Sequence, residues 1–82
     1  MSMRYAIEHQ PELQRFRIVQ QGEEALLEYQ LLGDSVDFWR TFVPDALRGQ
    51  GMAEQLVRHG LAWAEQKQLA VQASCWYVQK FL

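Results

Sequence analysis

The chain has 82 residues, 49% of them hydrophobic and 12% aromatic, which suits a single domain, 1–82, with a packed core and excludes a disordered segment. Its formal net charge is −2 and its eight Lys and Arg residues are scattered along the sequence, so no basic patch indicates a nucleic-acid partner. The single cysteine, Cys75, excludes an internal disulfide, and neither a signal-peptide core nor an apolar run of about 20 residues is present, so we expect a soluble, cytoplasmic protein with no membrane partner.

The first predicted elements are three stretches of alternating, β-branched or aromatic residues: 15–19, 24–32 and 36–43. Turns that contain glycine separate them. Pro44 ends the third stretch because it lacks a backbone N–H and biases the preceding residue toward extended geometry. We therefore predict an antiparallel three-stranded meander.

After this meander the hydrophobic period changes to that of a helix, which is expected to end near Lys67. Its apolar face consists of Ala53, Leu56, Val57, Gly60, Leu61 and Ala64. Residues 69–73 predict a further strand, which a right-handed crossover would place parallel to 36–43. Ser74 is expected to cap a short C-terminal helix at 75–82. The predicted fold class is α+β, with helices packed on one sheet.

The segment Arg48-Gly49-Gln50-Gly51-Met52-Ala53 lies between the predicted end of a strand and the start of the amphipathic helix. A helix N-terminus offers unpaired amides and a positive dipole end to an anion, and glycines let the backbone approach that anion closely. The position therefore favours a phosphate site. A P-loop would need Lys followed by Ser or Thr where this chain has Met52 and Ala53. The third glycine of a dinucleotide fingerprint would fall on Glu54.

This segment resembles the Gln/Arg-x-x-Gly-x-Gly/Ala motif of the GNAT N-acetyltransferases, which it matches at every fixed position. Thr41-Phe42-Val43-Pro44 and Cys75-Trp76-Tyr77-Val78-Gln79-Lys80-Phe81 also look like parts of short proteins made of little more than an N-acetyltransferase core. The likeness covers about residues 24–82 and implies a minimal GNAT-like fold: meander, central helix, parallel crossover strand and short C-terminal helix. Arg40 stands where such relatives often carry His, which argues against a His-based proton relay.

The resemblance implies that acetyl-CoA, or coenzyme A itself, is the ligand. Backbone amides around Phe42 and Val43 would pair with the pantetheine arm. Arg48 would add a positive charge near the pyrophosphate. The pyrophosphate itself would bind to what we call the phosphate turn: Gly49, Gln50, Gly51, Met52 and Ala53.

The terminal Cys-x-Tyr motif supplies two candidate catalytic residues, Cys75 and Tyr77. A thiol at a helix N-terminus tends to have a lowered pKa, which makes Cys75 a candidate nucleophile or general acid. Tyr77 is the rival proton donor. A buried cysteine that only fills apolar space is an equally good interpretation of Cys75. His9 and His59 are expected to be solvated, and no set of metal ligands is expected.

The sequence leaves functions of different classes open. The first is an N-acetyltransferase that moves acetyl from acetyl-CoA to an unidentified small amine or peptide. The second is a non-catalytic CoA-binding or protein-interaction module, favoured by the small size and by the lack of a clear catalytic base. An α+β domain without a ligand is the least favoured interpretation. We expect a monomer or a weak homodimer.

Overall fold

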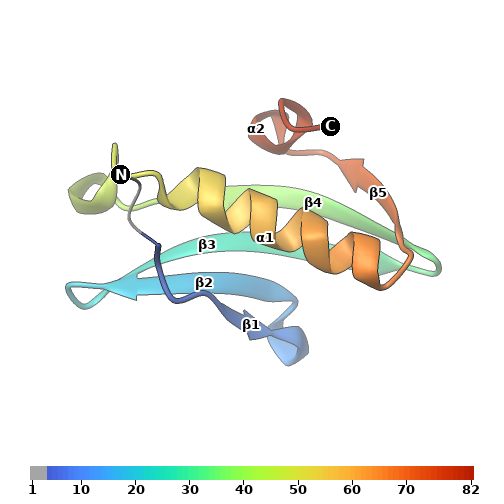
Figure 1. The fold of residues 1–82 in the computed structure, drawn as a ribbon, viewed down its shortest axis with the longest axis horizontal. Helices are drawn as coiled ribbons and strands as arrows, with labels where there is room; N and C mark the ends of the chain where they lie inside the picture. The colour runs from blue at the N-terminus through green and yellow to red at the C-terminus, as the bar shows by residue number, and fades with distance from the viewer. Residues whose placement is uncertain (1–3) are drawn as a thin grey trace.

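Five strands form one sheet, in the order β1-β2-β3-β4-β5, in the computed structural model, which describes residues 4–82 (Figure 1). Neighbouring strands from β1 to β4 are antiparallel, and β5 is parallel to β4. The strands are β1 Glu8–Gln10, β2 Arg15–Gln20, β3 Glu23–Leu32, β4 Ser35–Phe42 and β5 Ala70–Ala73. The helices are α1 Met52–Gln66 and α2 Trp76–Gln79, with two 3-10 helices, η1 Pro11–Leu13 and η2 Asp45–Leu47. The α+β class, the crossover through α1 and the parallel fifth strand confirm the predicted fold.

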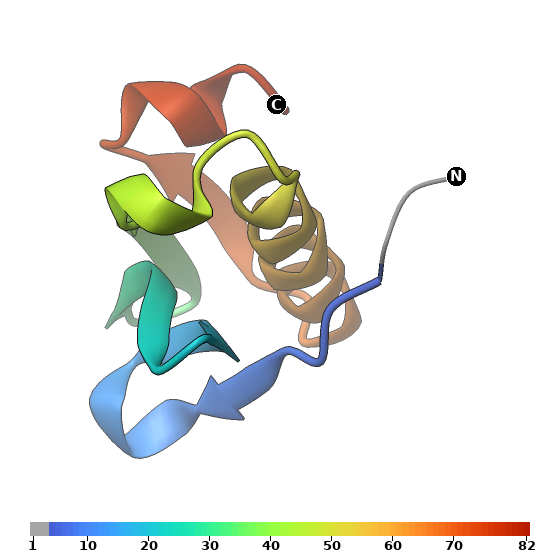
Figure 2. The same ribbon diagram turned by 90° about the vertical axis from the view of Figure 1, so that its left-hand side faces the viewer.

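Helix α1 lies across one face of the sheet (Figure 2). Four positions of the predicted apolar face are buried, Leu56, Val57, Gly60 and Ala64, whereas Ala53 and Leu61 are half-buried. Gly60 allows close packing, because a Cβ at this position would lie 2.7 Å from Leu27 Cδ2 and 3.0 Å from Phe38 Cε1. None of the helices within residues 4–82 has the length and apolar character needed to cross a membrane.

Strand β1 extends the sheet beyond the predicted three-stranded meander. It was missed because it has only three residues, Glu8–Gln10, and only His9 of these faces the core. The prediction that His9 is solvated is wrong, since its half-buried ring stacks on Phe16 with centroids 4.1 Å apart. Its Nε2 also lies 2.8 Å from the Tyr29 hydroxyl, and Trp63 of α1 meets the ring edge-on at 5.0 Å. His9 therefore ties β1 to both the sheet and the helix.

Ser74 does not cap α2, so that prediction is also wrong. Its amide and hydroxyl donate to the Asp37 carboxylate at 2.8 and 2.7 Å, which connects the end of β5 back to β4. The residue at the N-cap of α2 is Cys75, whose backbone N–H donates to the Phe38 carbonyl at 3.1 Å. These bonds fix the direction in which the chain leaves the sheet.

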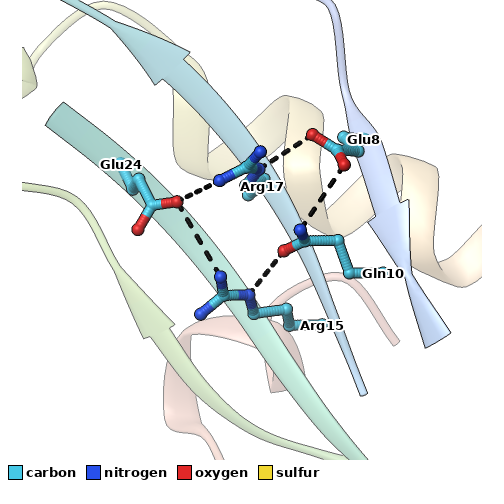
Figure 3. Close-up of polar contacts among 5 residues, drawn as sticks. All are labelled: Glu8, Gln10, Arg15, Arg17 and Glu24. Carbon is cyan, nitrogen blue, oxygen red and sulfur yellow. Dashed lines mark hydrogen bonds and ion pairs between the residues drawn. The ribbon is translucent and has the colours of Figure 1, made fainter. Parts of the chain in front are cut away.

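Helix α1 leaves the other face of the sheet uncovered (Figure 2). Figure 3 shows one network on β1, β2 and β3, made by Glu8, Gln10, Arg15, Arg17 and Glu24. Arg17 Nε donates to Glu8 at 2.8 Å and Arg15 Nε donates to Gln10 at 2.7 Å. Glu24 accepts from Arg17 and forms an ion pair with Arg15 at 3.8 Å. Exposed ion pairs of this kind each contribute about 0–1 kcal/mol, so the network keeps the face polar more than it holds the sheet together.

Acid should weaken the attachment of β1 through His9. Burial lowers the pKa of His9 below its ordinary value of 6.5, and the nearby His59 and Lys67 lower it further, against an opposite effect of Glu12. The unfolded chain therefore binds more protons, so this contribution is complete above pH 6.5 and is lost as the pH falls through the lowered pKa of the folded state. We expect the free energy of unfolding to fall between pH 7.5 and pH 5 by more in the parent than in His9→Phe.

Urea unfolding at the two pH values measures this difference. His9→Phe keeps a ring against Phe16 and lacks the hydrogen bond to Tyr29 at both pH values. The difference between parent and variant in how the free energy of unfolding changes with pH therefore reports the titration of His9. An identical fall in parent and variant would contradict the assignment to His9.

Candidate functional site

Both glycines of the phosphate turn adopt a backbone conformation that favours glycine. Gly49 and Gly51 have φ angles of +77° and +79°, in the left-handed region that other residues adopt only at a cost. A Cβ added at either glycine would meet no described atom within 4 Å, so the surface of the turn is open to a ligand. Gly51 is the N-cap of α1, and the first bond of the helix runs from Gln55 N to Gly51 O at 3.2 Å. The amides of Met52, Ala53 and Glu54 thus lie ahead of the helical ladder, where an anion is favoured.

Arg48 connects this turn to the end of β4. Its Nε donates to the Val43 carbonyl at 3.2 Å, and its Nη1 lies 3.2 Å from Asp45 Oδ1. The side chain is 67% exposed, so the ion pair with Asp45 is weakened by water. Arg48 thus stabilises the conformation of the loop, and Asp45 partly neutralises its positive charge.

Strands β4 and β5 part after a short paired segment. Their parallel register runs from Ser35 opposite Ala70 to Phe38 opposite Ala73, while β4 stays paired with β3 as far as Phe42. We call the point of divergence the fork. Beyond it, the edge of β4 that faced β5 is not paired with that strand, which is the kind of edge to which an extended ligand can bind.

A β-bulge in β4 coincides with the fork. Phe38 lies opposite Tyr29 and Arg40 lies opposite Glu28, which leaves Trp39 without a partner on β3. The shift by one residue sends Arg40 to the outer face, where it pairs with Glu28, and brings Thr41 to the face covered by α1. Sequence analysis missed the bulge, whose only local signal is the loss of strict alternation at Trp39 and Arg40.

Cys75 lies at the fork, with its Sγ 3.5 Å from Thr41 Oγ1. Its half-buried position by itself raises the pKa of the thiol, but the Thr41 hydroxyl and the backbone amides of Val78, Tyr77 and Thr41 outweigh burial and lower the pKa below its ordinary value. Two of these amides, those of Tyr77 and Val78, belong to α2, so the sulfur lies at the N-terminal end of that helix. The arrangement favours a reactive thiol over an inert apolar filler.

Tyr77 projects from α2 toward helix α1. Burial raises its pKa above the ordinary value, and Glu54 raises it further against an opposite effect of Arg58, so the hydroxyl keeps its proton at neutral pH. The Lys80 ammonium lies 4.9 Å from the Tyr77 ring centre, where it has a cation–π contact. Arg58 lies over Phe81 at 5.3 Å, which anchors the C-terminal end of the chain on α1.

A groove of about 930 Å³ adjoins the phosphate turn on the side of the N-terminal segment. It is bounded by Arg4, Tyr5 and Ile7 of that segment, by the phosphate turn, and by one stripe of α1 that includes Arg58 and His59. Sequence analysis assigned no role to Tyr5, although its alternation with Ile7 is a weak signal of an extended segment with one apolar side. The described residues contain no group of three His, Cys, Asp or Glu side chains placed to hold a metal ion.

The sequence of the chain is similar to those of known proteins. The sequence model of the family described as GCN5-related N-acetyl-transferase matches residues 15–82. The chain belongs to this family. It is 35% identical to Protein NATD1 of Bos taurus over 79 residues, which cover 93% of this chain and 70% of that protein. It is 34% identical to Protein NATD1 of Homo sapiens, with the same coverage, and 33% identical to that of Danio rerio over all of this chain and 77% of the relative.

The match to the GCN5-related N-acetyltransferase family covers both the fork and the phosphate turn. The matched region begins at β2 and therefore includes both features, together with Cys75 and Tyr77. Strand β1 and Tyr5 lie before it. The family thus accounts for the N-acetyltransferase-like fold, and the N-terminal groove wall lies outside the residues that the family model matches.

Replacing Gly51 should separate ligand binding from folding. Gly51→Val puts a branched side chain at a φ of +79°, which costs about 1–2 kcal/mol, and fills the open space that a phosphate would enter. We expect the affinity for CoA, measured by calorimetry, to fall tenfold or more. Gly33→Val is the matched control, because Gly33 has a φ of +64° and open surroundings in the β3–β4 turn, far along β4 from the phosphate turn.

The control should lose similar stability and keep the parent affinity. If a folded Gly51→Val protein binds CoA as the parent does, the phosphate turn is assigned wrongly.

Proposed function

We propose that this chain is an N-acetyltransferase that binds acetyl-CoA and transfers its acetyl group to a small amine or a peptide amine. The proposal rests on one observation: the end of strand β4 connects the two parts of the candidate site, the fork and the phosphate turn. Strand β4 leaves β5 after Phe38, and its continuation past Pro44 leads into the phosphate turn. A ligand with an extended arm and a pyrophosphate fits such an open edge followed by a helix N-terminus.

The residues present fit acetyl-CoA. The amides at the start of α1 and the open surface of Gly49 and Gly51 suit the pyrophosphate. Glu54 in the first turn would oppose an anion, but Arg58 Nε donates to its carboxylate at 2.9 Å and offsets that charge. The stretch from the fork to Val43 suits the pantetheine arm, with the Val43 carbonyl already occupied by Arg48.

Cys75 and Tyr77 are suited to different steps of acetyl transfer. The lowered pKa of Cys75 favours a thiolate that attacks the thioester carbonyl, so that an S-acetyl bond forms while the bond to the CoA sulfur breaks. The raised pKa of Tyr77 keeps a proton available for the departing CoA thiolate. A neutral acceptor amine then attacks the acetyl group, releases the Cys75 thiolate and gives up its own proton to solvent.

Acetyl-CoA should stabilise the folded chain. A ligand that binds only the folded state at 100 times its Kd adds about 2.7 kcal/mol, which raises the Tm of a domain of this size by about 10 °C or more. Differential scanning fluorimetry with millimolar acetyl-CoA, and with ADP as the matched nucleotide control, measures the shift. No shift with acetyl-CoA would overturn the proposed ligand.

Thiol release then decides between an enzyme and a binding module. With acetyl-CoA and a panel of amines and peptides, the proposed enzyme should release CoA thiol faster than the no-acceptor control. A strong thermal shift without release on any acceptor would favour the non-catalytic CoA-binding module.

Substitutions at Cys75 and Tyr77 should separate their roles. The parent incubated with acetyl-CoA alone should gain an acetyl mass increment that hydroxylamine removes, and Cys75→Ala should lack it while still binding CoA. Tyr77→Phe should bind CoA normally and lose about 10²-fold or more in kcat, because the leaving thiolate has no donor. Intact-protein mass spectrometry and steady-state kinetics give both readouts.

Full activity in Cys75→Ala together with strongly reduced activity in Tyr77→Phe would contradict the acetyl-enzyme and indicate direct transfer of acetyl from acetyl-CoA to the amine. Full activity in both variants would remove both residues from the chemistry.

A further inference from the structure

The N-terminal segment reaches the phosphate turn through one tyrosine. The Tyr5 hydroxyl donates to the Gln50 carbonyl at 2.7 Å, and the Tyr5 amide donates to Gln55 Oε1 at 3.0 Å. The ring is half-buried and packs against the core, so the hydroxyl is held in place from behind. The bond spans 45 positions of the sequence and joins an element outside the matched family region to the turn inside it.

The carbonyl that Tyr5 holds belongs to the peptide between Gln50 and Gly51. A trans peptide is planar, so its C=O and its N–H point in opposite directions, and the described residues contain no cis peptide. Fixing the Gln50 carbonyl toward Tyr5 therefore fixes the Gly51 N–H on the opposite side. Glycine at position 51 leaves this peptide more conformational freedom than other residues would, so an external contact is needed to hold one orientation.

We propose that Tyr5 is a positioning residue that orients the Gly51 amide of the phosphate turn for the pyrophosphate of CoA. This inference rests on the proposed binding of acetyl-CoA. Tyr5 touches no reacting atom in this role, since its hydroxyl acts on the ligand through the Gln50–Gly51 peptide. Its contribution is expected only with ligands that carry the pyrophosphate.

Tyr5→Phe tests the proposal because it keeps the ring packed and removes only the hydroxyl. We expect the calorimetric Kd for CoA to rise by about threefold to tenfold, the effect of one lost hydrogen bond. In kinetics, kcat/KM for acetyl-CoA should fall by the same factor, mostly through KM. For S-acetylpantetheine, which lacks the pyrophosphate and the nucleotide, kcat/KM should stay within about twofold of the parent.

Tyr29→Phe is the matched control, because it removes the hydroxyl that His9 of β1 contacts at 2.8 Å on the same N-terminal part of the chain. It should lower stability and leave the Kd for CoA unchanged within about twofold. An equal loss of CoA affinity in Tyr29→Phe and Tyr5→Phe would overturn the proposal, because loosening of the segment would then explain both.

Three other outcomes separate this inference from the proposed function. Parent-like CoA binding by Tyr5→Phe overturns the role of Tyr5 and leaves acetyl-CoA binding intact. An equal loss with acetyl-CoA and S-acetylpantetheine overturns it too, since the effect would not depend on the pyrophosphate. Failure of the parent itself to bind CoA overturns the proposed function, and the inference with it.

Discussion

The divergence of β4 from β5 is the constraint on which the rest of the site depends. The bulge at Trp39 changes which residues of β4 face the helix, so Thr41 lies beside Cys75 and Arg40 lies on the opposite face with Glu28. A regular strand would reverse these two residues, because successive side chains alternate between faces. Cys75 would then lose its hydroxyl partner, and a charged guanidinium would point toward the thiol. The environment of the thiol thus depends on the bulge that coincides with the fork.

Because the domain is small, one helix, α1, provides most of the packing against the sheet. Helix α1 covers one face of the sheet, and Gly60 brings its backbone so close to Leu27 and Phe38 that even a methyl group would clash. This contact fixes the height of the helix above the sheet and so the level at which its N-terminus meets the end of β4. The aromatic contacts of His9 with Phe16 and Trp63 close the β1 side of the core. On the opposite face, β1, β2 and β3 carry the network of Glu8, Gln10, Arg15, Arg17 and Glu24 (Figure 3).

Features governed by local periodicity and by glycine were predictable from the sequence. The strands of the meander, the apolar face of α1, the crossover strand and the glycine-containing turn before α1 all leave a pattern within a few neighbouring residues. The features that were missed depend on distant partners. His9 is buried only because Phe16 and Trp63 lie around it, and Tyr5 matters only because Gln50 lies within reach. Ser74 likewise depends on a distant partner, because its hydroxyl donates to the charged carboxylate of Asp37 instead of accepting from the local amides of α2 as a cap would.

At the two candidate catalytic groups, the neighbouring residues decide whether the effect of burial on the pKa is reversed or reinforced. Cys75 and Tyr77 are both half-buried, and burial raises the pKa of each. At Cys75 the Thr41 hydroxyl and the backbone amides favour the thiolate enough to reverse the effect of burial, whereas at Tyr77 the carboxylate of Glu54 reinforces it. One short segment thus presents a group inclined to lose its proton and a group inclined to keep it, two residues apart. Thr41 reaches Cys75 only because of the bulge, and Glu54 lies in the first turn of α1, next to the phosphate turn. The opposed protonation behaviour of Cys75 and Tyr77 therefore follows from the same strand end and helix start that form the proposed binding site.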